Sequence, residues 1–376
     1  MNRNYEESGL LTMTPLLDVS DLSIGFGKGD AVVRDVTFQV MPGETLALVG
    51  ESGSGKTITC RSVLRILPET AQIRSGKIMF NAPGSEPLDL LTIGERNMRS
   101  IRGDQISMIF QEPMRSMSPL HTLGNQVSEV LKLHSDMSAA KAKKAVLETF
   151  EHVGFPDPER VWNSYPFEMS GGMRQRAMIA MAMVSKPELL IADEPTTALD
   201  VTTQAQVLGL IKDLQRETGM AVILVTHDLG VVANMAESVV VMNKGRVMER
   251  GPASAVLRAP AHGYTKKLFA AAPSIPEIAE PARTERTSDA ILDLRNVSKT
   301  YTMKAGGWSA PKTVTACFEV NLSVLREKTV AVVGESGSGK TTCARIALGA
   351  ELPDRGGEVE FRATQDADPL FVHNMT

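Results

Sequence analysis

Short runs of apolar residues, separated by polar stretches, mark the first two thirds of the chain. These runs lie at residues 45–49, 106–110, 189–192 and 221–225. Strands that are apolar on both faces are typical of a parallel sheet covered by helices on both sides. Helices are expected at residues 56–67 and 138–150, and a hairpin at residues 238–249. The pattern therefore predicts an α/β fold built around a parallel sheet.

A nine-residue string occurs twice in the chain. Val49–Thr57 and Val333–Thr341 both read VGESGSGKT, which fits the phosphate-binding pattern G-x-x-x-x-G-K-[ST]. The stretch from Leu17 to Phe26 recurs from Leu292 to Tyr301, with a loop insertion before the second glycine loop. Chance cannot produce two such correspondences, so the sequence contains a duplicated nucleotide-binding module.

Composition narrows the class of protein. The chain has 376 residues, 43% of them hydrophobic and 22% charged, as in a soluble globular protein of about two domains. A net charge of −4 gives no basic field, so nucleic acid is not an expected partner. The three cysteines, at 60, 317 and 343, suit a reducing cytosol. No apolar run approaches the ~20 residues of a membrane span, and no signal peptide is recognised, so any membrane spans would come from other subunits.

The first glycine loop predicts binding of ATP. Its glycines let backbone N–H groups face one anion, and the helix that follows adds its positive dipole end. Lys56 would reach the β- and γ-phosphates, and the Thr57 hydroxyl would coordinate Mg²⁺. The predicted ATP contacts of this loop are Gly50, Glu51, Ser52, Gly53, Ser54, Gly55, Lys56, Thr57 and Ile58.

An acidic pair, Asp193 and Glu194, directly follows the apolar run at 189–192. Carboxylates at the end of a buried strand are costly unless a cation or a proton transfer requires them. We expect Asp193 to hold Mg²⁺ and Glu194 to orient and deprotonate the attacking water. The alternative is a solvated pair that opens a loop.

Three further polar residues lie at the ends of predicted strands or the start of a helix. Gln111 follows the run at 106–110 and could reach the metal and the water, or be an ordinary surface residue. His227 follows the run at 221–225 and could bind the γ-phosphate, or cap a helix. Ser170 opens a small-residue turn, Ser-Gly-Gly, that could receive a phosphate or serve only as an N-cap.

Taken together, residues 16–273 resemble the nucleotide-binding domain of an ABC transporter. The resemblance rests on the following matches: Gly50–Thr57 with the Walker A motif, Gln111 with the Q-loop, Ser170–Gln175 with the signature motif (Met169 standing where Leu is usual), Leu189–Glu194 with Walker B, Thr197–Asp200 with the D-loop and His227 with the switch histidine. It implies a P-loop NTPase fold with a parallel core sheet, an antiparallel β subdomain and a helical subdomain.

The resemblance also assigns roles to further residues. Phe26, and Tyr301 in the second copy, stand where the family places an aromatic ring against adenine; each could equally be a core residue. Two domains of the family close head to tail around two ATP molecules, so that the signature motif of one completes the site of the other. This implies ATP contacts from Ser170, Gly171, Gly172, Gln175 and Asp200.

Two stretches resemble the dipeptide and oligopeptide importer branch. They are residues 110–119 and 260–265, the latter with Gly263 where the branch usually has Pro. The tandem arrangement resembles fused importer ATPases, including those for glutathione-like and microcin-like peptides. The implied partners are two transmembrane permease subunits, a substrate-binding protein and a second ATPase domain, from a homodimer or a full tandem partner. The implied location is peripheral, on the cytoplasmic face of the bacterial inner membrane.

The second module departs from the family. We expect a leader at 1–15, the first domain at 16–273, a linker at 274–290 and a truncated second domain at 291–376. The second copy could bind ATP through Tyr301, Gly334, Gly337, Gly339, Lys340, Thr341 and Thr342. It lacks counterparts of Gln111, Ser170, Asp193, Glu194 and His227, so it should not hydrolyse ATP. It also lacks strands to bury its glycine-loop strand, so it should be marginally stable or packed non-natively.

Residues 363–376 do not resemble the family well, which suggests a truncated, frameshifted or partial reading frame. The interpretation that accounts best for the sequence is the ATP-hydrolysing subunit of a peptide importer. Two alternatives remain. One is a soluble ABC-type ATPase that acts on ribosomes or DNA, although the Pro-rich linker and negative charge do not favour it. The other is a non-catalytic binding or regulatory fragment.

Overall fold

The structure is a computed structural model of the chain. It describes residues 4–5, 11–12, 14–27, 29–111, 116–197, 199–271, 290–303, 312–335, 337–363 and 370–371. The chain forms two compact units, which are described separately here as residues 14–271 and 290–371. The expected linker falls outside the described residues except for Ala290, which begins a strand. Within the expected leader, β1 (Asn4–Tyr5) pairs with β2 (Leu11–Thr12).

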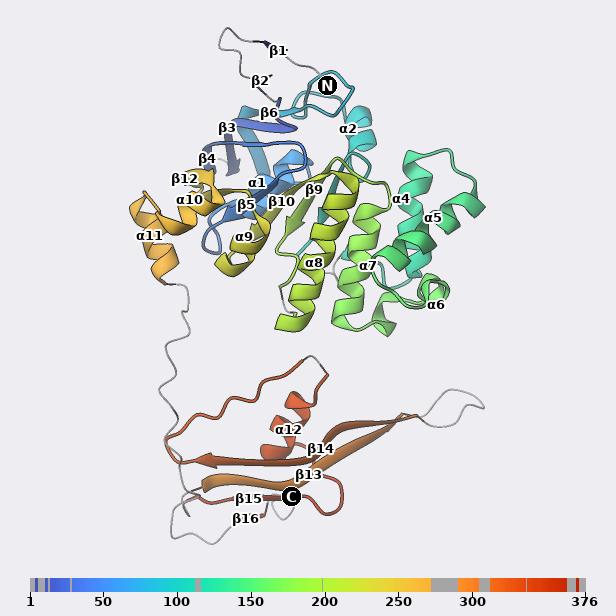
Figure 1. Cartoon of the computed structure of the whole chain (residues 1–376), viewed down its shortest axis with the longest axis vertical. Helices are drawn as coiled ribbons and strands as arrows, with labels where there is room; N and C mark the ends of the chain where they lie inside the picture. The colour runs from blue at the N-terminus through green and yellow to red at the C-terminus, as the bar shows by residue number, and fades with distance from the viewer. Residues whose placement is uncertain are drawn as a thin grey trace. The chain divides into compact units, whose positions relative to one another are not determined.

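A six-stranded sheet forms the centre of the first unit (Figure 1). Its order is β12 (Arg246–Pro252), β11 (Ser238–Asn243), β5 (Thr45–Val49), β10 (Ala221–Thr226), β9 (Leu189–Asp193) and β8 (Ile106–Ile109). All neighbours are parallel except β11 and β12, which form the predicted hairpin. Every residue of β5, β8, β9 and β10 is buried, which confirms the parallel sheet expected from the apolar runs.

The two faces of this sheet belong to different hydrophobic cores. Leu190 and Leu224 pack with the helices that follow β8 and β9. Ile191 and Ile223, which adjoin Leu190 and Leu224 in their strands, pack with a second sheet and with the helix after β5. Because successive side chains of a strand point to opposite faces, strands covered on both sides must be apolar throughout. This is the physical origin of the uninterrupted runs in the sequence.

The second sheet of the first unit is antiparallel. Its order is β4 (Ala31–Val40), β3 (Leu17–Phe26), β6 (Ala71–Phe80) and β7 (Leu88–Asp89). Phe38 and Phe80 from this sheet pack with Leu48 of β5 and with Val63 of the first long helix. The sheet therefore covers one face of the central sheet and corresponds to the antiparallel β subdomain that the family resemblance implies.

Helices cover the remainder of the first unit. A group that packs together, seen at one side of the unit in Figure 1, consists of α4 (Leu123–His134), α5 (Ala139–His152), α6 (Pro158–Asn163) and α7 (Gly171–Met183). Side chains of Thr122, Ser138, Asp157 and Ser170 cap their N-termini, as short polar residues commonly do. The other helices of this unit are α1 (Lys56–Val63), α2 (Glu95–Ile101), α8 (Val201–Thr218), α9 (Leu229–Met235), α10 (Ala253–Arg258) and α11 (Gly263–Ala270), with a 3-10 turn η1 at Pro166–Glu168.

The helix α1 is shorter than the sequence pattern predicts. We expected it to run to residue 67, but it ends at Val63 with Leu64 as its C-cap. The next residue, Arg65, has a φ of 52°, and a left-handed residue cannot continue a right-handed helix. Periodicity detected the apolar face of the segment but not this change of backbone conformation.

The second unit repeats the antiparallel sheet of the first. Its order is β14 (Lys312–Leu325), β13 (Ala290–Met303), β15 (Glu358–Phe361) and β16 (Leu370–Phe371), and one helix, α12 (Lys340–Ala347), packs on it. The register is also repeated, since Leu17 pairs with Phe80 and Leu292 with Phe361. Residues 328–335, which precede the second glycine loop, form no strand and are exposed, as expected for a segment without strands to cover it.

Throughout the described part of both units, no helix is both long and apolar enough to span a membrane.

Candidate functional site

Four of the predicted site segments follow directly on parallel strands. The glycine loop follows β5, Glu194 follows β9, His227 follows β10, and Gln111 stands two residues after β8. The carboxyl ends of parallel strands meet at one edge of a sheet, where ligands of open α/β folds bind. The topology alone thus gathers residues that are more than a hundred positions apart in the sequence.

The first glycine loop is wrapped around its own lysine. Lys56 Nζ donates to the carbonyl oxygens of Gly50, at 2.7 Å, and Glu51, at 2.9 Å. Gly50 and Gly55 have φ values of 150° and 99°, and a Cβ on Gly50 would lie 2.2 Å from the Met242 carbonyl oxygen. Burial lowers the pKa of Lys56, while Glu194 and Asp193 oppose that shift. The loop is therefore preformed, and its ammonium group lies where an anion would be received.

Asp193 and Thr57 form a pair suited to a hard cation. The Thr57 hydroxyl donates to Asp193 Oδ1 at 2.9 Å. The other carboxylate oxygen, Oδ2, is buried and has no hydrogen-bond partner among the described residues, and burial raises the pKa of Asp193. A hydroxyl and a carboxylate with a free, buried oxygen match the oxygen ligands that Mg²⁺ takes beside nucleotide phosphates. The residues present fit the ion that the sequence predicts here.

The other two predicted catalytic residues, Gln111 and His227, both contact the Glu194 carboxylate. Gln111 Nε2 donates to Glu194 Oε2 at 2.9 Å, and His227 Nδ1 lies 3.3 Å from Oε1. The Glu194 side chain is 18% exposed, whereas that of His227 is 69% exposed. Glu194 also has a φ of 46°, an uncommon value for a non-glycine residue that is found more often at functional sites. The structure thus brings Gln111, Glu194 and His227 together.

The predicted contacts at a distance from this centre are more varied. Phe26 is 40% exposed at the end of β3, so its ring is available to a ligand. Ser170 and Gly171 are exposed at the start of α7, where the Ser170 hydroxyl accepts the Met173 N–H. Asp200 accepts from the backbone N–H and the hydroxyl of Thr203 at the start of α8. Ser170 and Asp200 thus hydrogen-bond at the starts of helices, while Phe26 presents an exposed ring.

Gln175 is the buried member of the signature match. Its side chain is 2% exposed, while Ser170 and Gly171 at the start of α7 are exposed. Gln175 lies one helical turn after Gly171 and on the same side of α7, but deeper in the unit. The exposed part of the signature motif is its first turn, and contact of Gln175 with ATP stays a prediction.

Two residues that touch the site were not predicted. The Thr197 hydroxyl donates to Glu194 Oε2 at 2.9 Å; it opens the D-loop match, which was the available sequence signal. The Tyr264 hydroxyl on α11 is buried near Glu51 without a hydrogen-bond partner among the described residues, and burial raises its pKa. Tyr264 belongs to the stretch at 260–265 that resembles the importer branch, and nothing in that stretch indicated contact with the glycine loop.

The second glycine loop repeats the first in its own geometry. Lys340 Nζ donates to the Gly334 carbonyl at 2.8 Å, and Gly334, Gly337 and Gly339 have φ values of 155°, 85° and 90°. Thr341 and Thr342 follow at the start of α12. The Tyr301 hydroxyl donates to Glu351 at 2.7 Å, and that bond raises its pKa. No carboxylate takes the place of Asp193 or Glu194 beside this loop within the described residues of the second unit.

Comparisons with known proteins agree with the motifs. The family model described as "ABC transporter" matches residues 33–197 and 317–371. The chain is 45% identical over 347 residues to the peptidoglycan transport ATP-binding protein YejF of Agrobacterium fabrum, covering 91% of this chain and 62% of the relative. It is 48% identical over 277 residues to a putative peptide import ATP-binding protein of Brucella ovis, covering 73% and 82%. It is 39% identical over 387 residues to the glutathione import ATP-binding protein GsiA of Salmonella typhimurium, covering 96% and 62%.

Solved structures share the fold. The ATP-binding cassette MJ0796, in a dimeric post-hydrolysis state bound to ADP and Pi, has a TM-score of 0.55 at 26% identity, and the match covers 63% of this chain and 98% of that one. CbiO1 from Clostridium perfringens, part of the transporter complex CbiONQ, has a TM-score of 0.56 at 26% identity, covering 65% and 91%. These matches confirm the predicted fold class.

One prediction about the end of the chain is corrected. We expected residues 363–376 to depart from the family, but the family model continues to residue 371. The reason is a repeated hairpin, since Phe80 pairs with Leu88 in the first unit and Phe361 with Leu370 in the second. Pro-Leu occurs in both copies, at 87–88 and 369–370, and was overlooked as a signal. The chain spans about three fifths of the length of YejF and GsiA.

Three findings lead to one assignment: a family model that matches residues in both copies, ATP-binding relatives at 39–48% identity, and a site that joins the Walker, Q-loop and switch residues. The chain belongs to the ABC transporter family of ATP-binding proteins.

Proposed function

We propose that this chain hydrolyses ATP at the site formed by Gly50–Thr57, Asp193 and Glu194, and that hydrolysis powers the import of peptides or related small solutes. The observation that carries this proposal is the arrangement around Glu194. Its carboxylate contacts Gln111 and His227, and the preceding residue contacts Thr57 of the phosphate loop. The site thus places a base, Glu194, and a cation ligand, Asp193, beside the preformed phosphate loop, and two further side chains orient the base.

The residues of the site have complementary roles in hydrolysis. The loop N–H groups and Lys56 bind the β- and γ-phosphates, and Glu194 accepts a proton from water. The water oxygen then bonds to the γ-phosphorus as the bond to the bridging β–γ oxygen breaks, leaving ADP and phosphate. Gln111 and His227 orient the base, the water and the γ-phosphate. Mg²⁺, held by Thr57 and Asp193, would neutralise charge that develops on the phosphate oxygens.

The site is one half of a complete one. The signature turn at Ser170–Gly172 begins a helix, α7, whose first residues are exposed, so it is free to meet a nucleotide held by another ATPase domain. That domain would come from a second copy of this chain or from a full tandem partner. The second glycine loop could bind phosphate, but among the described residues of the second unit no carboxylate takes the place of Glu194 beside it. We retain the assignment of residues 16–273 to the complete domain and 291–376 to a partial second one.

Transport requires partners that the chain does not supply. Relatives named for import of peptides or glutathione, or for transport of peptidoglycan, support two membrane permease subunits and a substrate-binding protein as partners. The chain would then bind peripherally to the cytoplasmic face of the membrane. Which solute is carried would be decided by the binding protein and the permeases.

Replacement of the base tests hydrolysis. Glu194→Gln should lower kcat by about a hundredfold or more while nucleotide binding is kept. Glu188→Gln makes the same change in charge at the opposite end of β9 and should leave kcat unchanged. If the wild-type chain hydrolyses no ATP even with its permease partners, the proposed function is wrong. Uptake of labelled peptides by a strain that lacks the gene tests the import step.

A further inference from the structure

The phosphate-binding helix ends on an unusual residue. Arg65 directly follows the C-cap Leu64 and has a φ of 52°. Helices commonly end on a left-handed residue, and glycine usually occupies that place because it has no Cβ to strain there. The second copy follows this rule, since its C-cap Leu348 precedes Gly349, with a φ of 70°. The first copy therefore keeps an arginine where the second copy has glycine.

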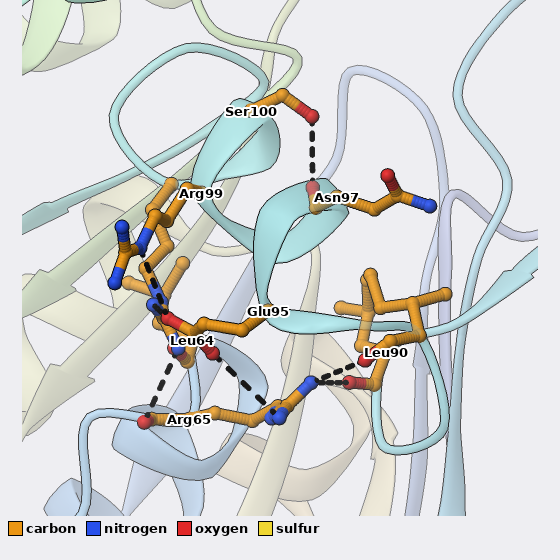
Figure 2. A network of polar contacts seen from close by, with 9 residues as sticks. Leu64, Arg65, Leu90, Glu95, Asn97, Arg99 and Ser100 are labelled. Carbon is orange, nitrogen blue, oxygen red and sulfur yellow. Dashed lines mark hydrogen bonds and ion pairs between the residues drawn. The ribbon is translucent and has the colours of Figure 1, made fainter.

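The Arg65 side chain makes contacts that glycine could not make (Figure 2). Its Nη1 donates to the Ile93 carbonyl at 2.7 Å and lies 3.5 Å from that of Leu90. Its Nη2 lies 3.7 Å from Glu95 Oε2. Of the three partners of Arg65, Leu90 and Ile93 precede α2 and Glu95 is its first residue. A strained, non-glycine position that persists is commonly over-determined by its surroundings, and here the surroundings are the start of α2.

A second arginine, at the C-terminal end of α2, also contacts the C-terminal end of α1. Arg102 follows the last residue of α2, and its Nε donates to the Leu64 carbonyl at 2.6 Å. It also donates to Glu95 Oε1 at 2.6 Å, and this bond is the first cause of the lowered pKa of Glu95. A guanidinium at the C-terminus of a helix satisfies free carbonyls and opposes the negative dipole end. We name Arg65, Glu95 and Arg102 the arginine clamp.

The clamp connects two parts of the catalytic site. The helix α1 begins with Lys56 and Thr57 at its other end. Beyond Arg102 the chain makes a tight turn, in which the Gly103 N–H donates to the Ile106 carbonyl at 2.9 Å, and then enters β8. Two residues after β8 stands Gln111, which contacts Glu194. The clamp thus links the phosphate helix to the strand that carries Gln111.

We propose that Arg65, supported by Glu95 and Arg102, is a positioning residue for ATP hydrolysis. It holds the C-terminal end of α1 against α2, and so keeps Thr57 aligned with Asp193 and Gln111 aligned with Glu194. This inference rests on the proposed function. The phosphate loop itself does not depend on the clamp, because the second copy, with Gly349, keeps the same contact from its lysine to the first glycine of the loop. Loss of the clamp should therefore lower kcat and leave KM for ATP nearly unchanged.

The test replaces Arg65 by the residue that the second copy uses. Arg65→Gly removes the guanidinium and relieves the backbone strain, so kcat should fall about tenfold while KM changes by less than about twofold and Tm does not fall. Arg65→Lys keeps the charge and should recover part of kcat. Lys186 is a matched control, since it is exposed and has a φ of 56°. Lys186→Gly relieves similar strain away from the clamp and should leave kcat unchanged.

Two results would overturn the proposal. One is an unchanged kcat in Arg65→Gly with Tm intact. The other is a parallel fall of kcat and Tm that Arg65→Lys does not recover, which would make the clamp merely structural. If wild type hydrolyses no ATP, the proposed function is wrong, but that result does not test the clamp. Hydrogen exchange at residues 103–111 of the full chain tests the clamp without an activity assay. Exchange there should be faster in Arg65→Gly than in wild type, and equal rates would contradict the proposal.

Discussion

The two glycine loops have the same nine residues but different surroundings. In both, the lysine donates to the first glycine's carbonyl, at 2.7 Å in one and 2.8 Å in the other. The residues before the loops differ. Val49 is fully buried in β5, between β10 and β11, whereas Val333 is 86% exposed and belongs to no strand. The same residues thus form the same loop in both copies, but the segment before the loop is a buried strand in the first copy and exposed, non-strand chain in the second.

The difference separates local from non-local causes of structure. The loop is held by contacts among its own residues and by the helix that follows it, so the nine-residue string suffices to form it. A parallel strand takes its hydrogen bonds from strands far away in the chain. For β5 these are β10 and β11, at residues 221–243, and no counterpart of these two strands lies among the described residues of the second unit. The antiparallel sheet is repeated because its partners lie close in sequence.

Replacement of the loop lysines should show the largest contrast. Lys56→Ala should lower kcat by about a hundredfold or more, because it removes a cation from the transferring phosphate. Lys340→Ala should change kcat by less than about twofold, since the described residues of the second unit place no counterpart of Glu194 beside that loop. Steady-state ATPase assays measure both. Equal losses in the two variants would show that the second loop takes part in hydrolysis.

The strand residues before the loops provide a second contrast, in stability. Val49→Ala removes two buried methyl groups from the core and should lower the free energy of unfolding of the first unit by about 2 kcal/mol. Val333→Ala makes the same change on an exposed side chain and should cost less than about 0.5 kcal/mol. Denaturant unfolding monitored by circular dichroism compares them. A cost for Val333→Ala equal to that of Val49→Ala would mean that a strand forms in both copies.

The residue after α12 can be replaced by the one that follows α1, which is the reverse of Arg65→Gly. Gly349→Arg introduces the left-handed strain that Arg65 bears, without the partners of the arginine clamp, and should destabilise α12 by about 1 kcal/mol. Gly349→Asn serves as control, because Asn tolerates the left-handed conformation better. Hydrogen exchange of the α12 amides measures the effect. If Gly349→Arg proved neutral, the strain argument for Arg65 would be weakened.

The smallest expected effect concerns the carboxylate of the clamp. The pKa of Glu95 is lowered from 4.5, first by the hydrogen bond from Arg102. A lowered pKa in the folded state adds stability above the unfolded-state value, and this stability is lost as pH falls through the folded-state pKa. Glu95→Gln should therefore lower Tm slightly at neutral pH, and the difference from wild type should shrink and vanish as pH falls through the folded-state pKa of Glu95. Thermal scans of both proteins over an acid pH series measure this, and a difference that does not depend on pH would contradict it.

The sequence predicted most of the central sheet and of the site, but not every orientation. Apolar runs located β5, β8, β9 and β10 within one residue, because strands buried on both faces must be apolar throughout. The end of α1 was missed because Arg65 has no sequence feature that announces a positive φ. The burial of Gln175 was missed because a motif gives residue types and spacing but not which of its residues other elements cover. The contact of Thr197 with Glu194 is local, three residues apart, whereas only the fold brings Tyr264 near Glu51.

By itself, the sequence determined the two glycine loops, their helices and the family of the chain, since these depend on neighbouring residues and on a short motif. Only the tertiary structure brought the residues of the first site together. Asp193, Gln111 and His227 reach the first loop because β8, β9 and β10 lie in one parallel sheet beside or near β5. Non-local pairing carries them there, because the hydrogen bonds of a parallel strand come from segments that lie far away in the sequence.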